Sequence, residues 1–207
     1  MENFETHKKL KTDGKTADLV RIAFFAVLIA VCSWITIPAQ IPFTLQTLAI
    51  FTALGILGGK RGTIAIAVYI LLGAAGLPVF SNFQGGIGVL ANATGGYILG
   101  FLLTGLAYWG ITAAFRKICR TRRSETVVQT AAMLLGNLVC YAAGTAHFIM
   151  IYAKNSGGIG IGAALSLCVV PFILPDLIKI AMALFITRFS SLSRRFGADR
   201  VSRRQDR

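Results

Sequence analysis

Six apolar segments dominate the sequence, and most of them are about as long as a membrane span. We predict helices at about 19–37, 44–59, 62–76, 94–115, 127–152 and 160–188. A helix needs roughly 20 apolar residues to cross a bilayer; the third segment is short, and prolines interrupt the sixth. With 55% hydrophobic and only 14% charged residues, the chain is typical of an integral membrane protein. The predicted fold class is an all-α bundle of six transmembrane helices.

The basic residues predict how this bundle lies in the membrane. Nineteen of the 21 Lys and Arg residues lie in four places: the first 21 residues, 60–61, 116–123, and from 188 onward. With six spans, all four places fall on one side of the membrane, and the positive-inside rule makes that side cytoplasmic, together with both termini. The net charge of +13 is therefore a topology signal. Short basic segments at span ends do not indicate a nucleic-acid interface.

The same pattern divides the chain into three parts. We expect a cytoplasmic N-terminal segment at 1–18, a membrane domain at 19–188 and a basic cytoplasmic tail at 189–207. Two connections on the outer side, 38–43 and 77–93, are apolar, aromatic and rich in glycine. Irregular backbone of this kind is tolerated near membrane depth where it is buried in protein or lines a cavity. We interpret both as lids or re-entrant segments.

Away from the span ends, two charged residues lie inside the predicted spans, and both are on the sixth helix. Asp176 and Lys179 are three residues apart, so their side chains are neighbours on one helix face. A lone charge at the centre of a membrane helix costs roughly 2.5–3.5 kcal/mol. One interpretation is an internal salt bridge that supports helix packing; the other, which we favour, is a polar ligand site. Because Pro175 suits a first helical turn, we expect a helix break there, with Asp176 at the positive end of a half-helix.

Two helix faces carry further patterns. Asn137, Tyr141 and Thr145 recur every four residues on the fifth helix, so they share a face that needs polar partners inside the bundle. Ala23, Ala26 and Ala30 fall on one face of the first helix. Such a small-residue stripe permits close helix contact. Both packing within the chain and docking of another subunit remain open.

Five motifs, in order along nearly the whole chain, resemble the BioY family. They are IPFTLQTLAIFTALGILGGKRG, GAAGLPVF, GGIGVL, ATGGYILGF and PFILPDLIKIAMA. This family comprises the biotin-binding S components of energy-coupling-factor (ECF) transporters. The resemblance implies a six-helix vitamin-capture subunit in a bacterial plasma membrane, acting with a transmembrane T component and two ATPases. It implies no enzyme activity, no cofactor and no metal.

The resemblance also implies a binding site. It carries over to Asp176, Lys179 and the segment from Leu77 to Thr94. The remaining predicted contacts are Asn92, Asn82, Tyr141, Gln46, Phe43 and Phe83, with Phe80 as a further aromatic cover. Many relatives have Gly-Pro where this chain has Asn92-Ala93, so Asn92 and Asn82 stay alternatives. A carboxylate can accept from the two N–H groups of a biotin ureido ring, and an ammonium can donate to its oxygen. The alanine stripe resembles the motif by which S components dock onto the T component.

Other functions remain as alternatives. An S component could bind a different small vitamin, and an intramembrane enzyme could use Asp176 or His147. An enzyme needs a second converging acid or base, or a metal set, and the sequence indicates neither. A purely structural membrane protein does not explain the buried charges. Since GGKRGT at 58–63 lacks the spacing of a phosphate loop, we expect uphill transport to depend on a partner's ATP.

Overall fold

The chain forms a helical bundle with one short β-hairpin. The computed structural model describes the backbone of residues 2–37, 41–119, 121–156 and 158–205, and the side chains of 14–37, 41–119, 121–153 and 158–190. The elements are α1 (Glu2–Trp34), β1 (Thr36–Ile37), β2 (Phe43–Thr44), α2 (Gln46–Leu57), α3 (Gly59–Ala74), η1 (Ser81–Phe83), α4 (Ile87–Ala91), α5 (Gly95–Phe115), α6 (Arg122–Ser156), α7 (Ile161–Cys168) and α8 (Val170–Gln205). Strands β1 and β2 are antiparallel, with Thr36 opposite Thr44.

The predicted helices are all present with shifted ends. They correspond to α1, α2, α3, α5, α6 and the pair α7–α8. Within the described residues, four segments are long and apolar enough to cross a membrane: 14–34, 95–115, 122–153 and 161–190. The apolar helix α2 has only 12 residues and α3 has 16. An all-helical membrane fold is confirmed, whereas six spans and the three-part division of the chain stay predictions. Residues 38–40 of the predicted 38–43 lid lie outside the described part.

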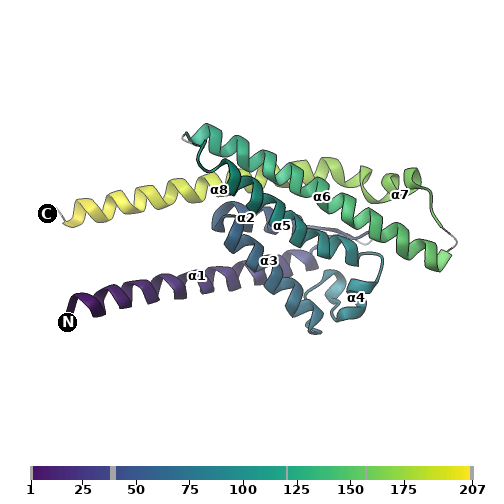
Figure 1. Cartoon of the computed structure of the whole chain (residues 1–207), viewed down its shortest axis with the longest axis horizontal. Coiled ribbons are helices and arrows are strands. Elements are labelled where there is room, and N and C mark those ends of the chain that lie inside the picture. Colours follow the sequence, from purple (N-terminus) through teal and green to yellow (C-terminus); the bar gives the residue numbers. More distant parts are fainter. Residues whose placement is uncertain (1, 38–40, 120, 157, 206–207) are drawn as a thin grey trace.

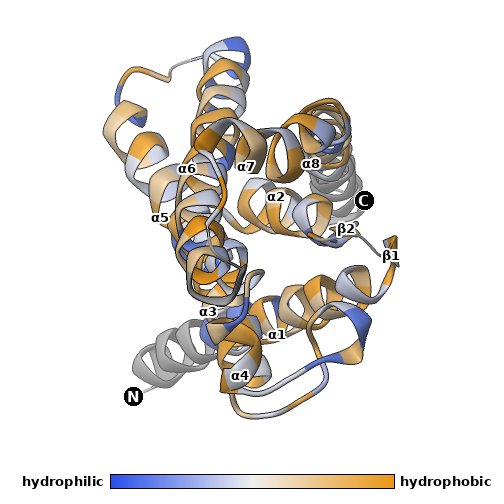
Figure 2. Ribbon diagram, turned by 90° about the vertical axis from the view of Figure 1, so that its right-hand side faces the viewer, coloured by the Kyte–Doolittle hydropathy of each residue, from blue (hydrophilic) through white to orange (hydrophobic). Residues whose placement is uncertain are grey.

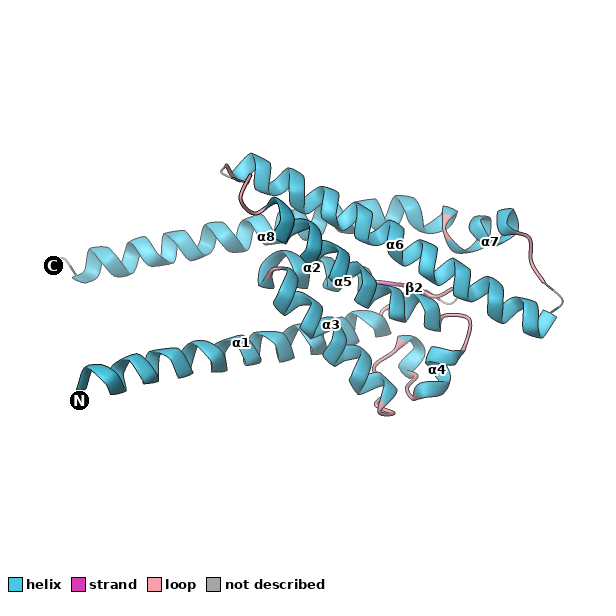
Figure 3. Ribbon diagram, viewed as in Figure 1, coloured by secondary structure: helices cyan, strands magenta, loops and turns pink. Residues whose placement is uncertain are grey.

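The connections separate into two groups at opposite ends of the bundle. The start of α1, the α2–α3 turn, the α5–α6 connection and the end of α8 lie at one end (Figure 1). The loops around α4 and the α6–α7 connection lie at the other (Figure 3). The four groups of basic residues were predicted to lie on one side of the membrane. The chain segments that carry them lie at one end of the bundle. Their side chains before residue 14 and after residue 190, and Arg120, lie outside the described part.

Helix α2 lies at the centre of the bundle. It contacts α1, α3, α5 and α8, and the end-on view shows it between α8 and α1 (Figure 2). Its side chains Ala53 and Leu54 are fully buried. By contrast, Leu138, Leu174 and Phe185 on the peripheral helices are well exposed. Apolar residues on both the inside and the outside are typical of a helix bundle in lipid.

The sixth predicted helix, which corresponds to α7 and α8, is interrupted, but not at the position that the sequence predicted. Helix α7 ends at Cys168, Val169 leaves the helical region (φ −124°, ψ −54°), and α8 begins at Val170. Pro175 lies inside α8, where its missing N–H leaves the Pro171 carbonyl without its helical partner. Asp176 therefore lies in the second turn of α8, and the prediction that it starts a half-helix is wrong.

The alanine stripe of α1 faces mainly inward. Ala26 and Ala30 are buried in the hydrophobic core, whereas Ala23 is exposed. Packing within the chain, one of the two alternatives, is thus what these two residues do. Subunit docking at Ala26 or Ala30 requires that packing to open, and the docking role of the stripe stays a prediction.

Candidate functional site

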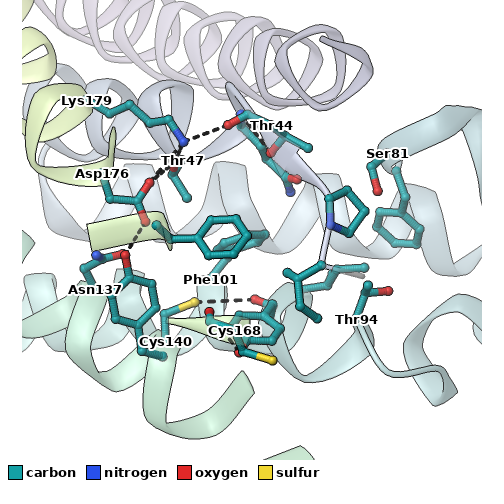
Figure 4. Close-up of a pocket in the computed structure, with 18 of the residues that line it drawn as sticks. Thr44, Thr47, Ser81, Thr94, Phe101, Asn137, Cys140, Cys168, Asp176 and Lys179 are labelled. Carbon is teal, nitrogen blue, oxygen red and sulfur yellow. Dashed lines mark hydrogen bonds and ion pairs between the residues drawn. The ribbon is translucent and has the colours of Figure 1, made fainter. Parts of the chain in front are cut away.

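A small cavity lies between α2, α5, α6 and α8. Its volume is about 70 Å³. One group of lining residues is apolar or aromatic: Ile41, Pro42, Tyr69, Phe80, Tyr97, Ile98, Phe101, Phe172, Cys140 and Cys168. The other is polar: Thr44, Gln46, Thr47, Ser81, Thr94, Asn137, Tyr141, Asp176 and Lys179. Figure 4 shows the charged pair at one side of the cavity, and Ser81 and Thr94 at the other.

Asp176 and Lys179 form a buried ion pair at the cavity wall. The Lys179 Nζ atom lies 3.0 Å from Asp176 Oδ1, and the two residues are only 5% and 3% exposed. Buried charges are tolerated when they are paired and their remaining hydrogen-bonding positions are filled. The first interpretation of these charges is therefore correct in that they form an internal salt bridge. Their position in a cavity leaves the ligand-site interpretation open as well.

Other elements complete the hydrogen bonding of the pair. The Thr47 hydroxyl, on α2, donates to Asp176 Oδ1 at 3.1 Å, and the Tyr141 hydroxyl, on α6, donates to Oδ2 at 2.6 Å. Lys179 also donates to the Thr44 carbonyl at 2.8 Å and to Thr47 Oγ1 at 3.0 Å. All three ammonium protons are thus used, and three of about four carboxylate acceptor positions are filled. A ligand can donate to the one free acceptor position of Asp176. A ligand acceptor must instead displace one of the oxygen atoms that Lys179 already contacts.

An aromatic ring covers the ammonium group. Lys179 Nζ lies 4.3 Å from the centroid of the Phe43 ring, a cation–π distance. Phe43 in turn stacks on Phe172, with ring centroids 5.8 Å apart. Phe43 therefore contacts the lysine but does not line the cavity, and its predicted contact with a ligand stays a prediction.

The polar stripe of α6 points into the bundle, as predicted. Asn137 and Thr145 are buried, and Tyr141 reaches Asp176. The hydroxyls of Thr145 and Tyr97 are 3.0 Å apart, so this face makes interhelical hydrogen bonds. Gln46 donates to the Tyr69 hydroxyl at 3.0 Å and borders the cavity. Tyr141 and Gln46 thus border the cavity, and their contact with a ligand stays a prediction.

The predicted lid after α3 is anchored to α1 and to the core. Ser33 donates to the Val79 carbonyl at 2.6 Å, and the Trp34 indole N–H donates to the Pro78 carbonyl at 2.9 Å. Phe80 is fully buried and packs edge-on against Tyr69. A Cβ at Gly73 would overlap the Phe80 ring. The absence of a side chain at Gly73 therefore allows this ring to pack in the core.

Three predicted contacts do not reach the cavity. Asn82, Phe83 and Asn92 have exposed side chains and are absent from its lining. Asn82 and Phe83 both have positive φ, 58° and 57°, and Phe83 stacks on Trp34 instead. The carbonyl of Asn92 lies 3.1 Å from His147 Nε2. Their roles in ligand binding remain predictions for a conformation other than this one.

Sequence analysis missed Thr47 and the Thr44 carbonyl. Both lie in the stretch TLQT, where polar residues 44, 46 and 47 begin an otherwise apolar helix. That cluster of polar residues could have indicated that Thr47 belongs to the site. A backbone carbonyl gives no signal in a sequence.

A buried ion pair at the wall of a cavity, within a bundle of membrane-type helices, is an arrangement that suits a membrane protein with a small ligand. The chain belongs to the BioY family, whose profile matches residues 5–197. It is 39% identical over 169 residues to the biotin transporter BioY of Thermotoga maritima, covering 81% of this chain and 92% of that one. It is 34% identical to biotin transporter BioY2 of Lactococcus lactis, covering 84% and 88%.

A solved structure has the same fold. It is the S component for biotin from an ECF-type ABC transporter, with a TM-score of 0.72 and 26% identity, covering 86% of this chain and 93% of that chain. The predicted family is therefore confirmed, and the chain is a multi-pass membrane protein of a transporter family.

Proposed function

We propose that this chain captures biotin as the S component of an ECF transporter and is not an enzyme. The observation that carries the proposal is the Asp176–Lys179 pair, whose charged atoms are 3.0 Å apart and which borders a cavity. We propose biotin as the ligand because the similar proteins are named for biotin. We further propose six spans, with the bundle end that carries both termini in the cytoplasm, because the basic segments gather there.

The site suits the ureido ring of biotin. The free acceptor position of Asp176 can take a ureido N–H, in a bond strengthened by the charge. The Lys179 ammonium can donate to the ureido oxygen once it releases one acceptor. Tyr97, Ile98 and Phe101 supply an apolar wall for the thioether ring and alkyl chain. The hydroxyls of Ser81 and Thr94, on the far side of the cavity (Figure 4), can donate to the ligand carboxylate.

Biotin entry requires the cavity to open. Its two fused rings and carboxyalkyl chain need more room than about 70 Å³. The segment 41–44 contributes Ile41 and Pro42 to the wall and the Thr44 carbonyl to Lys179. Moving this one segment would widen the cavity and free an ammonium proton for the ligand. We propose that biotin oxygen replaces the Thr44 carbonyl.

The proposed partners are a T component and two ATPase subunits. The chain's relatives include the S component of an ECF-type ABC transporter, and such a transporter takes its energy from ATP. Ala23 is the exposed member of the alanine stripe and is the position at which we propose contact with the T component.

The test is equilibrium binding of labelled biotin to the purified chain without ATP. Saturable binding is expected, with biotin competing and diaminobiotin, which lacks the ureido carbonyl, competing far less. The carboxylate Asp18, at the opposite end and paired with Arg61, provides a control: Asp18→Asn should bind normally. Absence of saturable binding by folded protein would refute the proposal, and equal competition by diaminobiotin would refute the assigned role of Lys179.

A further inference from the structure

A second and much larger cavity lies at the bundle end that carries the termini. Its volume is about 940 Å³, and it is bounded by α1, the α2–α3 turn, α5 and the start of α6. It shares no lining residue with the cavity at Asp176. The α2–α3 turn consists of Gly58 alone, at φ +80°, and Gly59 packs directly on the Trp109 backbone. The cavity is therefore bordered by closely packed helix ends.

The polar part of this cavity carries an excess of positive charge. Four cations line it, Lys15, Lys60, Arg61 and Arg116, against two anions, Asp18 and Glu125. Arg61 is 2.6 Å from Asp18 and is neutralised by it. Among the described side chains, Lys15, Lys60 and Arg116 make no ion pair. Together with the anion Glu125, these three cations leave a net charge of +2 around one hollow, which a bound anion would offset.

The rest of the cavity is apolar and borders the outer surface of the bundle. Leu19, Ile22, Ile64 and Val128 line it together with Trp109. Leu19, Ile64 and Trp109 remain 67%, 41% and 39% exposed. A tryptophan near basic residues at a span end is typical of the interface between membrane and water. A free inorganic anion would contact only the cationic part and leave this apolar part unused.

We infer that this cavity binds the headgroup of an anionic phospholipid. The phosphate would lie among Lys15, Lys60 and Arg116, with the acyl chains along Leu19 and Ile64. Basic hollows between helices on the cytoplasmic side suit such headgroups. The cytoplasmic placement rests on the proposed orientation, whereas the cavity and its charges do not. The lipid would hold α1, α3 and α5 together at the end away from the biotin site.

The experiment uses the tryptophan in the cavity wall as the probe. The chain has two tryptophans, so Trp34→Phe leaves Trp109 as the reporter. The purified protein is titrated in detergent with dioctanoyl phosphatidylglycerol, dioctanoyl phosphatidylcholine or sodium phosphate. We expect a saturable fluorescence change with phosphatidylglycerol, at a mole fraction where the other two have no effect.

Two double variants with equal loss of charge locate the site. Lys60→Gln with Arg116→Gln should weaken phosphatidylglycerol binding roughly thirtyfold. Lys117→Gln with Arg123→Gln removes two exposed cations that do not line the cavity, and should change it less than twofold. Biotin binding in both should equal that of the Trp34→Phe parent, which shows that they fold and separates this test from that of the biotin site.

Four results would overturn the inference. Equal responses to phosphatidylglycerol and phosphatidylcholine would exclude headgroup recognition. Saturation by sodium phosphate at equal affinity would make the ligand a free anion. Equal weakening in the two double variants would show diffuse attraction to surface charge. Loss of T-component co-purification in the Lys60 and Arg116 variant, without any loss of lipid binding, would assign the cavity to a protein contact.

Discussion

Replacing Asp176 with asparagine separates the two tasks of this side chain, which are to accept from the ligand and to neutralise Lys179. Hydrogen bonds to charged groups contribute about 1.5–3 kcal/mol, so Asp176→Asn should weaken biotin binding roughly 10- to 150-fold. The same change leaves Lys179, only 5% exposed, without its anion. Removal of one partner from a buried pair costs about 3–5 kcal/mol of stability. The variant should therefore lose both affinity and thermal stability.

A second substitution distinguishes these two losses. In the double variant Asp176→Asn with Lys179→Gln, no charge is left buried, and the two amides can still bond to each other and to Thr47. Most of the lost stability should return, but the loss of biotin affinity should persist, because the double variant lacks both the carboxylate that accepts from the ureido N–H and the ammonium that donates to the ureido oxygen. Equilibrium binding of labelled biotin and thermal unfolding, both in detergent, measure the two quantities on the same samples.

Two outcomes would contradict this reasoning. Affinity within twofold of the original in folded Asp176→Asn would show that the carboxylate does not contact the ligand. Recovery of biotin affinity in the double variant would show that the buried lysine charge, and not the missing acceptor, caused the loss. Asp18→Asn is the matched carboxylate control, since it is paired with Arg61 at the opposite end of the bundle.

The remaining predictions concern the lid and α1. Biotin should slow hydrogen exchange in residues 77–93 while α2 stays unchanged; equal exchange with and without ligand would show that this segment is no lid. Gly73→Ala should expel the Phe80 ring from the core and weaken biotin binding at least tenfold, whereas an unchanged affinity would mean that the ring is not a fixed wall. Ala26→Trp should reduce thermal stability because Ala26 is 2% exposed, whereas the exposed Ala23→Trp should bind biotin normally and block co-purification with a T component. Normal co-purification of Ala23→Trp would remove this position from the docking surface.

The periodicity and charge of the sequence were enough to predict the class of fold and the pairing of Asp176 with Lys179. Long apolar segments predict membrane helices because a span has a minimum length. Asp176 and Lys179 could be paired without a structure, since residues three apart on a helix are always neighbours. The inward face of α6 followed from the four-residue spacing of Asn137, Tyr141 and Thr145 in the same way.

The tertiary structure alone decided which distant groups meet this pair and which loop side chains do not. Thr47 is 129 residues from Asp176 in the chain, and Tyr141 is 35 residues away; helix packing brings them together, and no local pattern encodes it. Phe83 was expected at the ligand, but positive φ and the stack on Trp34 turn it outward. The helix break was predicted at Pro175 but lies at Val169. Pro175 lies within a helix that the surrounding bundle holds together. Local spacing determines which residues share one helix face, whereas the contacts between faces depend on how all the helices pack at once.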